Sequence, residues 1–66
     1  MELIEILKCF LYEAPELQIK DFQINKKSIT SRNLALESRL QELCLVVSDR
    51  LLLKVMDGNI TIWYEK

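Results

Sequence analysis

Residues 16–29, ELQIKDFQINKKSI, decide the fold, because their apolar side chains fit two different secondary structures. In a helix, Leu17 and Ile24 share a face while Ile19 and Phe22 lie nearly opposite to it, which is poor amphipathicity. In a hairpin that turns at Lys20-Asp21, all four side chains lie on one face, with Leu17 opposite Ile24 and Ile19 opposite Phe22. The turn itself lacks the Asn-Gly or Gly-X character that two-residue loops prefer, so both alternatives stay open. The four apolar residues are Leu17, Ile19, Phe22 and Ile24.

An amphipathic helix is predicted before this segment. Between Glu2 and Glu13, the charged residues at positions 2, 5, 8 and 13 fall within an arc of about 140° at the helical period. The remaining circumference is apolar, and Pro15 ends the helix near residues 13 and 14. We therefore expect a helix with a wide apolar face.

A second helix is predicted over residues 31–48. Its apolar stripe has spacings of 4, 3 and 4, with polar residues filling the opposite side. Thr30 or Ser31 supplies the oxygen for the N-cap. The stripe extends over less than two heptads, which favours packing on the chain's own core over a coiled coil. The stripe consists of Leu36, Leu40, Leu43 and Val47.

The C-terminal segment predicts a β-hairpin. Two runs rich in branched and aromatic residues, 51–56 and 60–64, flank Asp57-Gly58-Asn59, which holds the only glycine of the chain. Asp and Gly accept the positive φ that a tight hairpin turn requires. Alternation places Ile60, Ile62 and Tyr64 on one face of the second strand, and Trp63 on the other with Thr61 and Glu65.

The length and composition predict one small α+β domain, residues 1–66. A chain this short buries only roughly 60% of the surface that its unfolded form exposes. Half of its residues are nevertheless hydrophobic, so we expect part of this surface to meet a partner, most simply a second copy in a homodimer. The residues expected at this interface are Leu3, Leu7, Phe10 and Trp63.

The sequence gives no sign of a metal, a cofactor or a membrane span. It has two cysteines, Cys9 and Cys44, and no histidine, so an ordinary four-ligand zinc site is excluded. Both cysteines lie in apolar runs typical of buried thiols, although a bridge between them stays open. The first residues lack a basic stretch and a cleavage site, which favours the cytoplasm, and the longest apolar run, residues 43–47, is far too short to cross a bilayer.

Charge is segregated along the chain although the net charge is only −1. Residues 20–39 contain five basic and two acidic residues, whereas the segments on both sides are acidic. Such a small cluster is often only a solvated surface, but basic and small polar groups near a helix N-terminus also suit phosphate.

The order of elements resembles a winged helix-turn-helix domain over residues 17–66. In residues 34–47, LALESRLQELCLVV, the pattern Leu36-x3-Leu40-x2-Leu43-x-Leu45-Val46 is similar to the recognition helix of that family. Residues 24–29 resemble the turn before that helix, and 51–64 resemble the wing. The resemblance implies a helix, a short element, a helix and a C-terminal hairpin, with helix–hairpin–helix–hairpin as the alternative. It also implies that a set of polar residues faces a DNA groove, namely Lys26, Lys27, Ser28, Thr30, Ser31, Arg32 and Asn33, and that Arg39 contacts a phosphate.

Two non-enzymatic functions follow from these observations. The chain has no histidine, no glycine-rich phosphate loop and no nucleophile beside a recognisable base, so catalysis is not expected. The first function is a winged-helix DNA-binding transcriptional regulator that acts as a homodimer on duplex DNA. The alternative is a protein-interaction module, such as an inhibitor, adaptor or subunit, that binds no nucleic acid.

Overall fold

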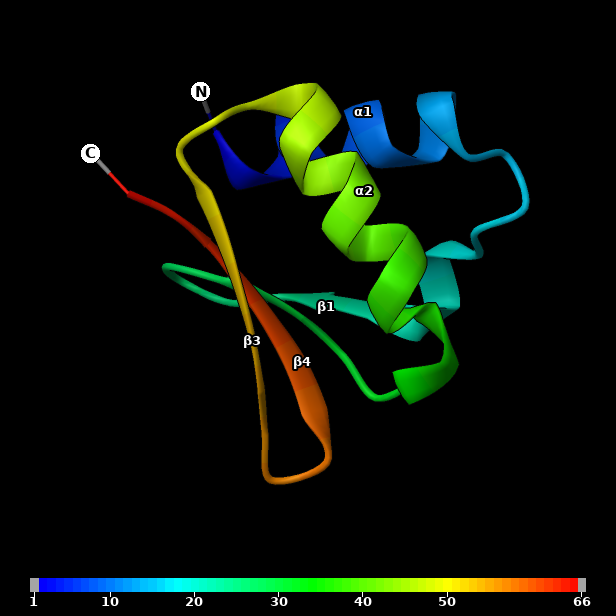
Figure 1. Ribbon diagram of the computed structural model, residues 1–66, viewed down its shortest axis with the longest axis vertical. Coiled ribbons are helices and arrows are strands. Elements are labelled where there is room, and N and C mark those ends of the chain that lie inside the picture. The colour runs from blue at the N-terminus through cyan, green and yellow to red at the C-terminus, as the bar shows by residue number, and fades with distance from the viewer. Residues whose placement is uncertain (1, 66) are drawn as a thin grey trace.

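The computed structural model describes residues 2–65, which form a four-stranded antiparallel sheet with two α-helices on one of its faces (Figure 1). The chain is therefore a small α+β protein, as its sequence predicts. In chain order the elements are α1 (Leu3–Glu13), the 3-10 turn η1 (Ile19–Asp21), β1 (Phe22–Ile24), β2 (Ile29–Ser31), the 3-10 turn η2 (Leu34–Leu36), α2 (Glu37–Val47), β3 (Leu51–Met56) and β4 (Asn59–Tyr64).

The sheet consists of two hairpins joined side by side. The strand order is β1-β2-β4-β3, so that β2 and β4 are its central strands. In the register, Ile29 of β2 lies opposite Ile62 of β4, which in turn lies opposite Leu53 of β3. These pairs place apolar side chains in a row across one face, toward the helices.

The core lies between this face and the two helices. Ile29, Ile60 and Ile62 of the central strands are almost completely buried, as are Phe10 of α1 and Leu40 of α2. The alternation predicted for Ile60, Ile62 and Trp63 is therefore confirmed, because Trp63 lies on the other face and is only half-buried.

The first helix and the C-terminal hairpin agree with the sequence. α1 ends at Glu13, just before Pro15, as predicted. The hairpin turn consists of Asp57 and Gly58, which have φ values of 52° and 76°. Two consecutive positive φ angles are typical of a type I′ turn, the connection that matches the right-handed twist of paired strands.

The second helix starts later than predicted. Ser31 is the last residue of β2, and α2 begins at Glu37, so the prediction of a helix from residue 31 with Thr30 or Ser31 as its N-cap is wrong. Asn33 caps the 3-10 turn η2, which leads into α2, since its Oδ1 accepts a hydrogen bond from the N–H of Ala35 at 3.2 Å. The N-cap of α2 itself is Leu36, whose side chain makes no capping hydrogen bond. Residues 29–31 form β2, which pairs with β1 on one side and β4 on the other, and this pairing is incompatible with a helix.

The segment 16–29 forms a strand and part of a hairpin, but with a different turn from the one considered. Lys20 and Asp21 belong to η1, and the connection lies at Asn25–Ser28, where the N–H of Asn25 donates to the carbonyl of Ser28 at 2.7 Å. The side-chain amide of Asn25 also donates to the hydroxyl oxygens of Ser28 and Thr30, both at 3.4 Å. This connection is what the family resemblance interpreted as the turn before a recognition helix, so the order of elements is helix, hairpin, helix, hairpin.

Candidate functional site

The face of the sheet that points away from the helices is the candidate site. We call it the open face, and define it by the strand side chains that alternate with the buried ones. All of them are half-buried or exposed, and they combine hydroxyl, amide, apolar and basic groups around the single tryptophan. The open-face residues are Gln23, Thr30, Asn59, Thr61, Trp63, Leu52, Lys54 and Met56.

Basic residues surround this face. Lys26 and Lys27 form the β1–β2 connection, Arg32 follows β2, and Arg50 precedes β3. The carbonyl of Arg50 accepts a hydrogen bond from the N–H of Glu65 at 2.9 Å, which extends the β3–β4 register by one more pair. Together with Lys54 these residues make five basic side chains, all exposed, and among residues 2–65 none of them takes part in an ion pair.

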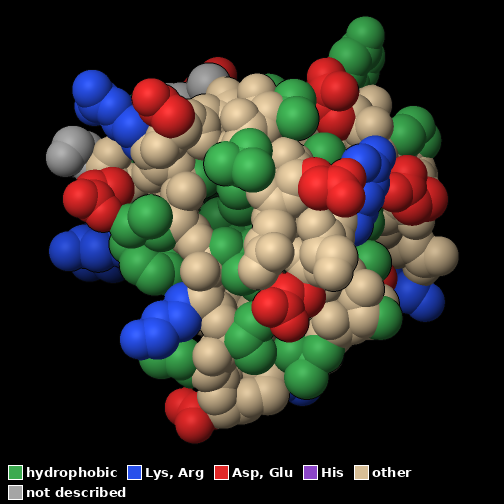
Figure 2. Space-filling view, in the orientation of Figure 1, with side chains coloured by type: hydrophobic (Ala, Val, Ile, Leu, Met, Phe, Trp, Pro, Cys, Tyr) green, Lys and Arg blue, Asp and Glu red, His purple; other side chains and the backbone are tan. Residues whose placement is uncertain are grey.

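The helical layer has the opposite charge. Residues 2–16 and 37–47 hold six glutamates and only two basic residues, Lys8 and Arg39. Figure 2, in which α2 faces the viewer, shows carboxylates over and around the helices and basic side chains mainly at the rim. The sheet layer, residues 17–36 and 48–65, holds six basic and four acidic residues, and one of the acidic residues, Glu65, lies beside Arg50. Its net charge is thus +2, against −4 for the helical layer.

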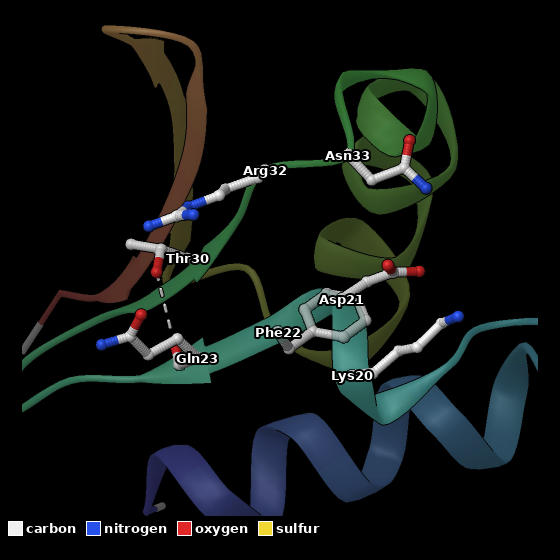
Figure 3. A pocket seen from close by; sticks show the side chains of 7 residues that line it. All are labelled: Lys20, Asp21, Phe22, Gln23, Thr30, Arg32 and Asn33. Carbon is white, nitrogen blue, oxygen red and sulfur yellow. Dashed lines mark hydrogen bonds between the residues drawn. The ribbon is translucent and has the colours of Figure 1, made fainter.

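A polar hollow of about 340 Å³ lies at the β1–β2 end of the open face (Figure 3). Within it, the Thr30 hydroxyl donates to the carbonyl of Gln23 at 3.5 Å, and the Arg32 side chain extends past Thr30. Two cations and one carboxylate meet there, so the hollow suits an anion better than a cation. Its lining consists of Lys20, Asp21, Phe22, Gln23, Thr30, Arg32 and Asn33.

Most of the predicted DNA-contacting residues are brought together by the first hairpin. Lys26 and Lys27 are exposed in its connection, Ser28 and Thr30 follow, and Arg32 and Asn33 line the hollow. They lie on a strand and its connections, however, and not at the start of a helix.

Two predicted contact residues lie elsewhere. Ser31 is buried on the helix side of the sheet, where its hydroxyl oxygen accepts a hydrogen bond from the N–H of Asn33 at 3.2 Å. Arg39 belongs to the helical layer and binds Glu16 at 2.9 Å and Glu42 at 3.3 Å. The prediction that Ser31 faces a ligand is wrong, because its side chain is enclosed. The phosphate contact of Arg39 stays a prediction.

The predicted interface residues also separate. Leu7 and Phe10 are buried in the core of the chain itself, so the prediction that they contact a partner is wrong. Leu7 and Phe10 face the sheet, because an amphipathic helix buries its apolar face against the core of its own domain. Leu3 is half-buried against the core, whereas Trp63 lies on the open face, opposite Leu52.

Sequence reasoning missed Gln23, Arg50 and Lys54. The signal for the last two was present, because residues 50, 52 and 54 alternate with the apolar positions 51 and 53. Because Trp63 lies on the open face, the same alternation also assigns Arg50 and Lys54 to the open face. Gln23 depends on the position of the β1–β2 turn and could not be placed.

The helical layer has a different kind of surface. A mostly apolar hollow of about 380 Å³ lies between α1 and α2, and one side of it is formed by Tyr12, which is 83% exposed. The other residues that line it are Lys8, Cys9, Glu13, Val46 and Val47.

Both cysteines are free thiols. Cys9 is half-buried and Cys44 is buried, and burial raises the pKa of the Cys44 thiol to about 11. Among residues 2–65, no three Cys, Asp or Glu side chains converge closely enough to hold a metal ion.

The same part of the chain has no helix with the length and apolar character needed to span a bilayer. No protein-family model, no curated protein and no solved structure matches this chain.

Proposed function

We propose that this chain binds nucleic acid through the open face of its sheet. The observation that carries the proposal is the separation of charge, with five basic side chains and the carboxylate of Glu65 around the open face, and six glutamates against two basic residues on the helical layer. A phosphate backbone is attracted to the first surface and repelled by the second, which orients the protein on its ligand.

The chemistry of the open face favours a single strand. Trp63 offers a ring on which a base can stack, and Thr30, Thr61 and Gln23 offer hydrogen-bonding groups to base edges or sugars. Single-strand binders commonly combine an aromatic residue on a sheet with a basic rim. The proposal keeps Lys26, Lys27 and Arg32, which the winged-helix resemblance assigns to DNA, and leaves out Arg39, which lies on α2. It replaces an inserted helix by the sheet.

The test is fluorescence anisotropy of a labelled single-stranded oligonucleotide and of its duplex, each titrated at several salt concentrations. With five phosphate contacts and about 0.7 counterions released per contact on a single strand, we expect a log-log slope of about −3.5. Binding should also quench Trp63, the only tryptophan. Tighter binding to the duplex would contradict the single-strand assignment.

Matched charge reversals locate the surface. Lys54→Glu on the open face should weaken binding at least about tenfold and make the salt slope less steep. Lys8→Glu makes the same charge change on α1 and should leave the affinity almost unchanged. Equal effects of both variants, or no binding by the unchanged chain at low salt, would overturn the proposal.

The absence of binding would favour the alternative function, a protein-interaction module. One observation supports that alternative, namely the apolar hollow beside Tyr12 and Val46, which are 83% and 66% exposed. Exposed apolar groups gathered beside a hollow commonly mark a protein contact.

A further inference from the structure

The outer side of β3 offers a complete row of backbone hydrogen-bonding groups. β3 is an edge strand, since β4 is its only neighbour in the sheet. It has six residues, Leu51–Met56, of which only Lys54 is charged and none is proline. A long apolar edge of this kind is suited to pairing with another strand.

The hairpin turn determines which groups point outward. A two-residue turn at Asp57-Gly58 makes Met56 and Asn59 a hydrogen-bonded pair, and such pairs alternate along an antiparallel ladder. The bond from Glu65 to Arg50 fits this alternation. Leu51, Leu53 and Val55 are therefore the residues whose N–H and C=O groups face away from β4.

We propose that β3 pairs antiparallel with β3 of a second copy, with Leu53 directly opposite Leu53 of that copy. In this register Leu51 lies opposite Val55 of the second copy. Each residue whose N–H and C=O groups point away from β4 therefore lies opposite another such residue. The two-fold arrangement makes six hydrogen bonds, whereas a shift by two residues leaves fewer of these residues matched. The edge is thus complementary to itself, which identifies a second copy as the partner.

The side chains fit the same register. On the helix side, Leu53 and Val55, the latter 40% exposed, extend the apolar row of the sheet across the two-fold axis. On the open face, Lys54 lies opposite Leu52 of the second copy, where its aliphatic stem can cover the 37% exposed leucine. The two Lys54 residues are offset along the strands and do not face each other.

The opposite edge of the sheet does not offer the same surface. β1 has only three residues and leads directly into Lys26 and Lys27. A short strand followed by two charges is a common protection against edge pairing. The proposal thus commits to one edge, and it does not rest on nucleic-acid binding.

Sedimentation equilibrium of the full chain tests the association. We expect a mass of two chains at tens of micromolar. Chemical synthesis with N-methylated Leu53 keeps the side chain and every bond within the hairpin but removes an outward N–H, so dimerisation should weaken at least tenfold with an unchanged circular dichroism spectrum. A monomeric unmodified chain, or a dimer that the methyl group does not affect, would overturn the proposal.

Disulfide trapping tests the register. In a Cys9→Ser background, Leu53→Cys should crosslink to the same position of the second copy, because directly opposite residues have Cα atoms about 5.5 Å apart, within disulfide range. Val55→Cys is the control, since the two Val55 positions lie about 13 Å apart along the strands. Efficient crosslinking at position 55, or at neither position in a folded dimer, would contradict this pairing.

Discussion

Arg39 of α2 donates a hydrogen bond through Nε to Oε2 of Glu16 at 2.9 Å and thereby ties the second helix to the segment that follows the first. Its Nη2 also donates to the carbonyl of Glu13, in the last turn of α1, at 3.4 Å. The last carbonyls of a helix lack partners within the helix, and a cation is favourable there. A basic residue that the sequence assigns to a ligand thus holds the helical layer together.

Arg39→Gln should lower the midpoint of urea unfolding at neutral pH and leave the affinity for nucleic acid unchanged. The pKa of Glu16 lies below its ordinary value of 4.5, because its carboxylate accepts a hydrogen bond from its own backbone N–H and another from Arg39. A carboxylate whose pKa is lowered by folding stabilises the folded state at pH values above its ordinary pKa. This stabilisation is lost as the pH falls through the pKa of the folded state. The difference between the variant and the unchanged chain should therefore shrink at pH 3, and a constant difference would contradict this explanation.

Gly58→Ala should destabilise the protein by about 1 kcal/mol, measured by urea unfolding. A Cβ at this position would meet no atom within 4 Å, so the whole effect comes from the φ of +76°. Asp57→Asn is the control, because asparagine adopts the neighbouring positive φ at least as readily in an Asn-Gly turn. It should be neutral or slightly stabilising.

Alkaline pH should unfold the protein partly through Cys44. Burial raises the pKa of its thiol from 9.0 to about 11, so the folded chain retains a proton that the unfolded chain loses. The contribution of this thiol to the free energy of unfolding is fully present below pH 9. It decreases as the pH rises toward 11, by about 3 kcal/mol if this group acts alone. Cys44→Ala should remove this part of the pH dependence. A thiol reagent should label Cys9 before Cys44 at pH 8, because Cys9 is less buried.

Ile62→Val should reduce the free energy of unfolding by about 1 kcal/mol, because it removes a methyl group from a side chain that is 1% exposed at the centre of the sheet. Leu45→Ala removes more atoms, but Leu45 is 81% exposed, and its effect should stay within about 0.5 kcal/mol. Equal effects of the two changes would contradict the assignment of the core. Chemical denaturation followed by Trp63 fluorescence measures both.

The elements that the sequence predicts correctly are those determined by local chemistry. Pro15 ends α1, and Asp57-Gly58 places the turn of the second hairpin, so neither depends on the rest of the chain. The open face could be predicted only in part. Alternation places Trp63 on it, but which residues join it from the first hairpin depends on the β1–β2 register.

The turn at Asn25–Ser28 could not be predicted, because its loop residues, Lys26 and Lys27, lack positive φ and carry no turn signature. What determines the turn is distant, since β2 pairs with β4 and its buried Ile29 must face the helices. The start of α2 follows from the same pairing, because residues that join a sheet on both sides are not available to a helix.

The pairing of β2 with β4 also determines how the chain can fold. Each hairpin joins residues close in sequence and can form early, whereas Ile29 and Ile62 meet across about half of the chain. Closing so long a loop loses conformational entropy before its contacts form, and such non-local contacts slow folding. Two local hairpins thus remain incomplete until the segment containing α2 brings them together, and the contact between the central strands is where the protein acquires its topology.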